Sequence, residues 1–373
     1  MSITKLEKLN YIDAIRGLAI IMVIMHHTAQ QGFVKIPHAV AVFLSLGSRG
    51  VQLFFIASAF TLFRSYKNRS SVENKPTRNF FIRRFFRISP VYYLAILYYM
   101  FHESLGAKYW LGSQPFISMY NKISNMLFLH GFSPYWTNTL VPGGWSIAVE
   151  MMFYLIFPFL FFRIKTINDA FVFLNISLIF KLIFQEILSY YQLMTSDFLW
   201  NEYLFYYFPC QLPIFALGII MFFLIQDSKS INQVSNKTLL SSLALLPLQI
   251  GSALDFLYLN HIIFGIIFVV FGVLLSKGKF SFFNITLIRY IGKISYSMYI
   301  FHFIVISWLA KYHLMDFFDN YLINYVTRLL LILFISIIIS KISYNLIEVP
   351  FQKLAKKIIS KMETGTKVLA SES

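Results

Sequence analysis

Ionisable residues inside the first apolar segment carry most of the chemical information in this sequence. Asp13, Arg16 and His27 stand at the start and in the middle of an apolar stretch near the N-terminus. Charged groups are costly in hydrocarbon, so such residues usually face the protein interior and mark a functional site. At about 100° per residue, Arg16 and His27 share one helix face and lie about 16 Å apart along the axis, whereas His26 points about 80° away. One helix is therefore predicted to hold a cation near one membrane edge and an imidazole deep in the bilayer.

Two arginines at the start of the third apolar segment form a second candidate site. Arg84 and Arg87 belong to the run Arg-Arg-Phe-Phe-Arg-Ile-Ser-Pro and are one helical turn apart, so they can converge on one anion. The forked guanidinium group is suited to phosphate. The alternative is that these arginines only anchor the helix at the anionic inner leaflet. The spacing leaves both interpretations open.

A carboxylate near the outer end of the fourth apolar segment is predicted to lie at the depth of His27. Glu150 follows Trp145, a residue type typical of membrane interfaces, and Ser146. It lies roughly 7 Å deeper than Trp145, and His27 lies about 20 Å into a core of about 30 Å, counted from the opposite edge. The two depths agree. They allow a catalytic pair, or a His–Glu hydrogen bond that only holds the helices together.

Several polar side chains near the C-terminal end of the chain are further candidates. Tyr296, Tyr299 and His302 lie close to one stripe of the ninth apolar segment. Hydroxyl groups between membrane helices often make plain packing hydrogen bonds, and we favour that interpretation for Tyr296 and Ser297. The role of His302 stays open. Glu348, at the end of the last apolar segment, is most simply a counter-ion to an arginine.

The elements that must position these residues are predicted to be membrane helices. Hydrophobic residues make up 58% of the 373 residues and charged residues only 13%, which indicates an all-α, polytopic membrane protein rather than a soluble domain. A single membrane domain is predicted over residues 1–350. A basic tail follows over 351–373, as an amphipathic helix running into disorder. The ten apolar segments long enough to span, or nearly so, are near 14–33, 40–63, 80–101, 145–164, 169–192, 203–226, 238–257, 261–277, 285–310 and 322–347.

Charge sets the predicted orientation and excludes several partners. If the N-terminus is cytoplasmic, the large majority of the 32 Lys and Arg residues fall on the cytoplasmic side, which places both termini there. The net charge of +16 is thus explained by topology, and no nucleic-acid partner is expected. The single cysteine, Cys210, excludes an internal disulfide framework. The histidine spacing predicts no metal site, and no nucleotide-loop or serine-hydrolase motif occurs, so no bound cofactor is expected.

Taken together, these motifs resemble the acyltransferase-3 family of integral membrane acyltransferases, and the resemblance covers residues 11 to 350. Gln52 stands where that family usually has aspartate, Ala59 where it usually has glycine, and Met151 where a second acidic residue is frequent. No hydrolase-like domain of the kind appended to some longer relatives is expected. The matching blocks are, in family order, Tyr11-Ile-Asp13-Ala-Ile-Arg16-Gly17 with His27, Gly50-Val-Gln-Leu-Phe54-Phe55-Ile-Ala-Ser58-Ala-Phe60, Arg83-Arg84-x-x-Arg87-Ile-x-Pro90, Trp145-Ser146-x-x-x-Glu150, Ser295-Tyr296-Ser297-x-Tyr299-x-x-His302 and Ile347-Glu348-x-Pro350.

The resemblance implies transfer of an acetyl or other short acyl group from acyl-CoA, a substrate rather than a bound cofactor, to a hydroxyl group. Arg16, Arg84 and Arg87 would bind the donor at the cytoplasmic edge. His27, with Glu150, would act as the general base or carry the acyl group briefly. The residues expected in supporting roles are Asp13, Trp145, Ser146, Tyr299, His302 and Glu348.

The resemblance also implies a setting and an acceptor class. The expected location is the bacterial cytoplasmic (inner) membrane, with the lipid bilayer as surroundings. The expected acceptor is a glycan or lipid-linked sugar of O-antigen, capsule or exopolysaccharide, by association with surface-polysaccharide systems. The sequence predicts no oligomeric state.

Two other functions fit the same spans and buried charges. The first is a transporter or flippase for a lipid-linked sugar, which needs neither arginines at a donor edge nor a deep histidine. The second is a non-catalytic assembly subunit of a polysaccharide machine, in which the buried polar residues serve only packing. Transfer of an acyl group by the purified protein would separate the enzyme from both.

Overall fold

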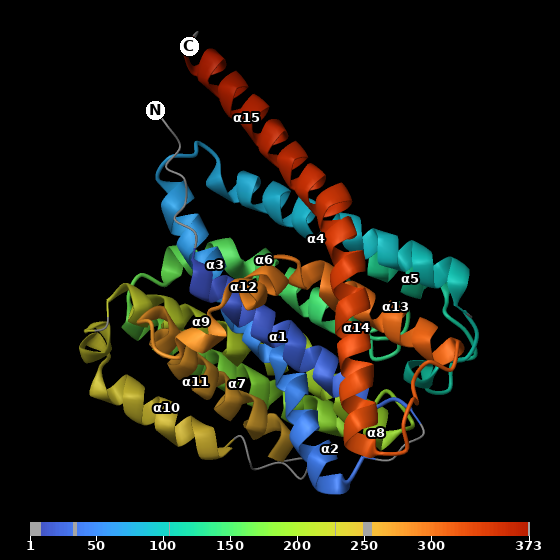
Figure 1. The fold of residues 1–373 in the computed structure, drawn as a ribbon. Coiled ribbons are helices and arrows are strands. Elements are labelled where there is room, and N and C mark those ends of the chain that lie inside the picture. The colour runs from blue at the N-terminus through green and yellow to red at the C-terminus, as the bar shows by residue number, and fades with distance from the viewer. Residues whose placement is uncertain (1–8, 33–35, 104, 228, 249–255, 372–373) are drawn as a thin grey trace.

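The chain forms a bundle of helices (Figure 1). The computed structural model describes residues 9–32, 36–103, 105–227, 229–248 and 256–371, and the side chains of 247–248, 256–259 and 365–371 lie outside this description. Over the described residues the chain contains helices and connecting turns and no strand. The all-helical fold predicted from composition is therefore confirmed.

Nine of the ten predicted apolar segments coincide over their described residues with one helix or with two consecutive helices, and residues 249–255 of the remaining segment, 238–257, lie outside the described part of the chain. The α-helices are α1 (Asn10–Ala29), α2 (His38–Ser45), α3 (Gly50–Ser70), α4 (Pro76–His102), α5 (Met119–Met126), α6 (Gly144–Arg163), α7 (Ile167–Tyr190), α8 (Asp197–Tyr206), α9 (Phe208–Gln226), α10 (Asn236–Leu248), α11 (Phe256–Ser276), α12 (Thr286–Lys293), α13 (Ser295–Lys311), α14 (Tyr321–Ser343) and α15 (Val349–Ser371). Short turns of 3-10 helix are η1 (Leu46–Arg49), η2 (Tyr109–Leu111), η3 (His130–Phe132), η4 (Ser230–Gln233) and η5 (Ser281–Phe283), and η6 (Tyr344–Glu348) is a π-helical turn.

Fewer helices than ten meet a strict test for crossing a membrane. Among the described residues six helices are long and apolar enough, and a seventh is added if α12 and α13, bent by 79° at their junction, count as one span. This supports a multi-pass membrane protein. The number of ten spans and the orientation of the termini stay predictions.

The first helix is the centre of the bundle (Figure 1). It packs against α3, α12, α13 and α14. The crossing of α1 and α12 is close because both helices carry a glycine there: a Cβ atom on Gly17 would lie 2.1 Å from the carbonyl oxygen of Ile288, and one on Gly292 would lie 1.7 Å from that of Asp13. Small residues allow membrane helices this approach. The crossing fixes Asp13 and Arg16 relative to α13.

The fourth helix carries the arginine motif and is held at its start by the C-terminal helix. Pro76 occupies the first turn of α4, where its missing N–H costs no hydrogen bond. The carboxylate of Glu363, on α15, accepts hydrogen bonds from the backbone N–H groups of Asn74 (2.9 Å) and Lys75 (3.3 Å) and from Nδ2 of Asn79 (2.8 Å). The start of α4 is therefore capped by a residue almost 290 positions away in the sequence.

The last helices form one long rod. Helix α14 continues through η6 into α15, which projects beyond the body of the bundle (Figure 1). The amphipathic helix predicted for the tail is present. On α15 the side chains of Ala355 and Ile359 are buried, whereas Lys353, Lys356 and Lys357 are exposed. The disorder predicted farther along falls partly on residues whose side chains lie outside the described part, and it stays a prediction.

Candidate active site

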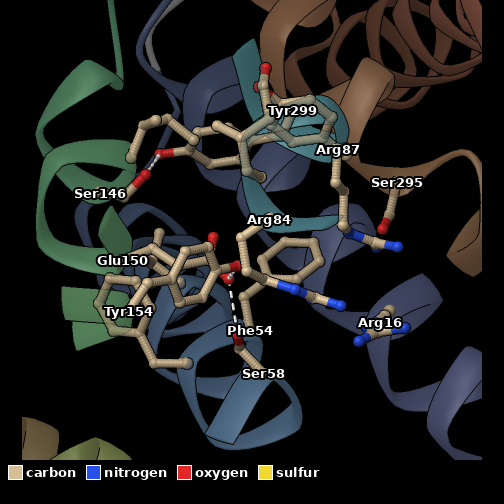
Figure 2. Close-up of a pocket in the computed structure, with 15 residues that line it drawn as sticks. Arg16, Phe54, Ser58, Arg84, Arg87, Ser146, Glu150, Tyr154, Ser295 and Tyr299 are labelled. Carbon is tan, nitrogen blue, oxygen red and sulfur yellow. Dashed lines mark hydrogen bonds between the residues drawn. The ribbon is translucent and has the colours of Figure 1, made fainter. Parts of the chain in front are cut away.

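A cavity between five helices contains most of the residues singled out from the sequence (Figure 2). It encloses about 620 Å³ of empty space, part of which is open to the outside. Helices α1, α3, α4, α6 and α13 each contribute side chains to its wall. The lining residues are Arg16, Val51, Phe54, Phe55, Ser58, Arg84, Arg87, Ile88, Ser146, Ile147, Glu150, Tyr154, Ser295, Tyr296 and Tyr299.

The three predicted donor-binding arginines share this cavity. Figure 2 shows the guanidinium groups of Arg16, Arg84 and Arg87 pointing into the same space. Arg16 donates from Nη2 to the hydroxyl of Thr61 (3.0 Å), and the guanidinium of Arg84 lies 5.8 Å from the ring centre of Tyr154. The Nε of Arg84 is buried and has no hydrogen-bond partner among the described residues. This arrangement can bind an anion whose oxygens supply the missing acceptors.

Glu150 is the one carboxylate in the described wall of the cavity. It accepts short hydrogen bonds from the hydroxyls of Ser58 (2.6 Å) and Tyr154 (2.5 Å). Both donors bind Oε1 of this half-buried carboxylate, and no described cation lies in salt-bridge contact with it. Because three arginines face one glutamate, the lining carries an excess of positive charge.

His27 lies outside the set of residues that line the cavity. Its Nδ1 is 3.0 Å from Oε1 of Gln30, and its ring centre is 5.5 Å from that of His302 and 4.6 Å from that of Phe303. The structure therefore gives His27 and Glu150 separate partners. The shared His–Glu hydrogen bond considered from their equal depths is not among the contacts that either residue makes.

Tyr299 connects the cavity to the two histidines. Its ring lines the cavity and has its centre 5.9 Å from that of His302. Its hydroxyl accepts a hydrogen bond from Ser146 (2.8 Å) and donates one to the carbonyl oxygen of Gly143 (3.1 Å). Gly143 adopts φ of +75°, a conformation that favours glycine and lets α6 begin at this point. These bonds hold Tyr299 between the arginines and the imidazoles.

His302 is fully buried and its hydrogen bonding fixes its tautomer. Its Nδ1 lies 3.1 Å from the carbonyl oxygen of Met298, so this nitrogen carries the hydrogen. Its Nε2 is buried and lacks a partner among the described residues. In the neutral ring, this leaves Nε2 as an unused acceptor, on a ring whose centre is 5.5 Å from that of His27.

The remaining predicted residues lie around this site. Asp13 is close enough to Arg16 to interact electrostatically with it. Trp145 was predicted from its residue type as an interfacial anchor, but it is buried and stacks on Tyr206 with ring centres 4.4 Å apart. Its ring also contacts that of Phe55, a residue that lines the cavity, with centres 6.1 Å apart.

Packing contacts hold the polar residues at the start of α13. Ser297 donates to the carboxylate of Glu348 (2.5 Å), and Tyr296 donates to the carbonyl oxygen of Ile88 on α4 (2.6 Å). These bonds agree with the packing role favoured for Tyr296 and Ser297. Glu348 is also within electrostatic reach of Arg87.

Several contributing residues were assigned no role from the sequence, although Ser58 belongs to one of the matching motifs. Ser58, Thr61 and Tyr154 hold the charged groups of the cavity, and Gln30 contacts His27. Tyr154 follows Glu150 by four positions and Gln30 follows His27 by three, so helical spacing was the signal that indicated both contacts. Thr61 had no such signal, because its partner lies on another helix.

Comparison with known proteins decides the family. The family described as "Acyltransferase domain", Acyl_transf_3, matches residues 9–344. The chain belongs to the acyltransferase-3 family. No solved structure was found to match it.

Named relatives of this family member are bacterial. A protein of Staphylococcus aureus (strain COL), provisionally named an O-acetyltransferase, is 24% identical over an alignment that covers 96% of this chain and 60% of the relative. The O-acetyltransferase OatA of S. aureus (strain NCTC 8325 / PS 47) is 23% identical, with 92% and 57% covered. The peptidoglycan O-acetyltransferase OatA of Listeria monocytogenes is 29% identical over 44% of this chain and 26% of its own length. The chain thus spans less than two thirds of the length of these relatives.

Proposed function

We propose that this acyltransferase moves an acetyl group, or another short acyl group, from acyl-CoA to a hydroxyl of a bacterial surface glycan. The observation that carries the proposal is the arginine-lined cavity. Arg16, Arg84 and Arg87 surround one space that holds a single carboxylate, and Tyr299 links this space to His302 and His27. Enzymes of group transfer need this combination of an anion-binding end and a basic group.

The donor would bind with its phosphates at the arginines. Guanidinium groups bind phosphate through paired, charge-assisted hydrogen bonds, which are stronger in a partly enclosed cavity than in bulk water. In the proposed topology of ten spans with both termini cytoplasmic, the arginines stand at the cytoplasmic side, where acyl-CoA is made. The pantetheine arm would pass Tyr299 and bring the thioester to the histidines.

His27 would act as the general base in the transfer step. It takes the proton of the acceptor hydroxyl while the oxygen attacks the thioester carbonyl, which forms the ester C–O bond and breaks the C–S bond. The proton then passes from His27 to the departing CoA thiolate, so charge and atoms balance. In the alternative, His27 itself takes the acyl group and passes it on. Glu150 stays in the proposal as the carboxylate that balances the arginines.

The names of the relatives support an O-acetyl transfer. The two OatA proteins are named as O-acetyltransferases, and that of L. monocytogenes as acting on peptidoglycan. By this likeness, the proposed acceptor is a hydroxyl group of a cell-surface glycan. The candidate glycans are peptidoglycan, O-antigen, capsule and exopolysaccharide. The proposed location is the cytoplasmic membrane, as a multi-pass protein.

Analysis of the surface glycan tests this function. Mass spectrometry and NMR would compare glycans from cells with the wild-type gene, with His27→Ala and with the gene deleted. We expect an acyl ester in the wild type that is absent from both other strains. Unchanged acylation with less surface glycan in the deletion strain would contradict the proposal and indicate a transporter or an assembly subunit.

A further inference from the structure

We propose that Gln30 is the positioning residue that fixes His27 in the tautomer with a free Nε2, and that this nitrogen is the atom that receives the acceptor proton. The inference rests on the proposed role of His27 as the base. It names the reacting nitrogen and the residue that selects it. Gln30 belongs to none of the motifs that carry the family resemblance.

The argument begins at His26, where a chain of hydrogen bonds starts. His26 hydrogen-bonds to the backbone of Leu44 and, through Nε2, to Nε2 of Gln30 (3.2 Å). A neutral imidazole has one N–H group, which it donates to a carbonyl oxygen when one is in reach. We assign the N–H of His26 to Nδ1, directed at the backbone of Leu44, so that its Nε2 accepts from the NH₂ group of Gln30.

The orientation of the Gln30 amide determines which ring nitrogen of His27 carries the hydrogen. An amide has an NH₂ group that donates and an oxygen that accepts. With NH₂ directed at His26, Oε1 faces Nδ1 of His27 at 3.0 Å and can only accept. Nδ1 of His27 must therefore carry the hydrogen, and Nε2 is left with its lone pair. The helix makes the arrangement possible, because residues three and four positions apart lie on one face.

The neighbours of His27 on α13 leave that lone pair unused. His302 donates its own N–H to the carbonyl oxygen of Met298 (3.1 Å), so it has no hydrogen to offer to His27. Phe303, with its ring centre 4.6 Å from that of His27, presents only carbon. Nε2 of His27 makes no hydrogen bond to a described residue and is available to a substrate hydroxyl.

A chain of this kind matters because the wrong tautomer has no base at the reacting position. In the serine-protease triad an aspartate performs the same selection on histidine, and replacing it changes the tautomer while the geometry survives. In this protein the neutral amide of Gln30, which is held by His26, would select the tautomer of His27. As a neutral amide, Gln30 adds no charge at this exposed C-terminal end of α1.

Nitrogen-15 NMR of the full-length protein in lipid bilayers tests the tautomer directly. The protein would be labelled at histidine, and the His27 signal would be identified by its loss in His27→Ala. We expect His27 in the Nδ1–H form. In Gln30→Met, which keeps the length but removes both polar atoms, we expect a mixture with the Nε2–H form. In Gln30→Glu the carboxylate still accepts from Nδ1, so the wild-type form should persist. Gln31→Met is the matched control and should leave the signal unchanged.

Kinetics of CoA release from acetyl-CoA by the same proteins gives the second readout. We expect Gln30→Met to lower kcat about tenfold, the order of one net hydrogen bond, with KM for acetyl-CoA unchanged. Gln30→Glu should retain most of the activity.

The two readouts separate this inference from the function on which it rests. A wild-type His27 in the Nε2–H form, or a Gln30→Met protein with unchanged tautomer and kcat, would overturn the inference. If His27→Ala still acylates the glycan while the wild type shows the Nδ1–H form, the catalytic role of His27 fails and the inference that names Nε2 as the proton acceptor fails with it. The hydrogen-bond chain would then be only structural.

Discussion

Three guanidinium groups and one carboxylate meet in the central cavity, and the charge imbalance among them determines what can bind there. Glu150 is already satisfied by Ser58 and Tyr154, so it does not neutralise the arginines through direct hydrogen bonds. The three arginines are half-buried, and Arg16 donates to the hydroxyl of Thr61, so an anion in the cavity would supply acceptors for their remaining N–H groups. Substituting these arginines therefore tests donor binding.

Removing one arginine should weaken donor binding selectively. Hydrogen bonds to charged groups are worth about 1.5–3 kcal/mol, so Arg84→Gln is expected to raise KM for acetyl-CoA about 10- to 100-fold. Acetyl-pantetheine, which lacks the nucleotide phosphates, should be affected little. The control is Arg163→Gln, because Arg163 is exposed and its guanidinium lies 5.2 Å from the ring centre of Phe159. Equal losses for both substrates would show that Arg84 does not bind the phosphates.

For individual residues, the sequence indicated which side chains belong to the cavity more successfully than which side chains contact each other. The motifs pointed to Arg16, Arg84 and Arg87, and the structure brings all three to one cavity. The pairing of His27 with Glu150 was considered because their depths agree, but depth is one coordinate of three. The direction in which each helix faces depends on packing, and counting residues along a span does not provide it.

Among the helices, the crossing of α1 and α12 carries the tightest constraint. A Cβ atom at position 292 would lie 1.7 Å from a backbone oxygen, and a backbone cannot move aside as a side chain can. Overpacking of this kind costs about 1–3 kcal/mol, so Gly292→Ala should lower the thermal midpoint of unfolding of the purified protein.

A second glycine provides the comparison for this prediction. At Gly265 an added Cβ would meet only the side-chain ends of Leu217 and Ile214, so Gly265→Ala should have a smaller effect on the midpoint. If both variants unfold at the same temperature, the close crossing is not a main source of stability. Activity of Gly292→Ala should fall along with the midpoint, because the crossing sets the position of Arg16 relative to α13.

The contact between α15 and α4 gives another prediction for an element. Glu363→Ala removes the acceptor of the Asn74 and Lys75 amides at the start of α4. Loss of a cap costs about 0.5–2 kcal/mol, so hydrogen exchange of these two amides should become faster, by about tenfold. Mass spectrometry of exchanged peptides over 70–80 measures this. Glu186→Ala, a change at an exposed position on α7, serves as the control. Unchanged exchange in Glu363→Ala would mean that α15 does not cap α4.

The contact between α15 and α4 is also a feature of the fold that the sequence did not predict. The apolar run over 80–101 predicted where most of α4 lies. The cap on α4 comes from a tail that was predicted to be amphipathic and then disordered. A capping residue is recognised from sequence when it is adjacent to its helix, and Glu363 is not.

For the whole molecule, the open question is how many helices cross the membrane. Composition predicted the helical membrane bundle, and six or seven helices meet the test of length and apolarity. Helix α4, which carries Arg84 and Arg87, is not among them. Those arginines lie against a cavity inside the bundle and not against lipid, so their cost differs from that of lipid-facing charges.

We therefore predict that α4 crosses the membrane despite its charges. Single cysteines at Ser71, before α4, and at Ser113, after it, would be introduced into a Cys210→Ser background; both serines are exposed. A membrane-impermeant maleimide added to whole cells should label position 113, and position 71 only after the cells are opened. Labelling of both from the same side would show that α4 returns without crossing. The helix that carries Arg84 and Arg87 would then not connect the cytoplasmic face with the opposite face. The proposed transfer of the acyl group across the bilayer would be wrong, even if the protein proved to be an acyltransferase.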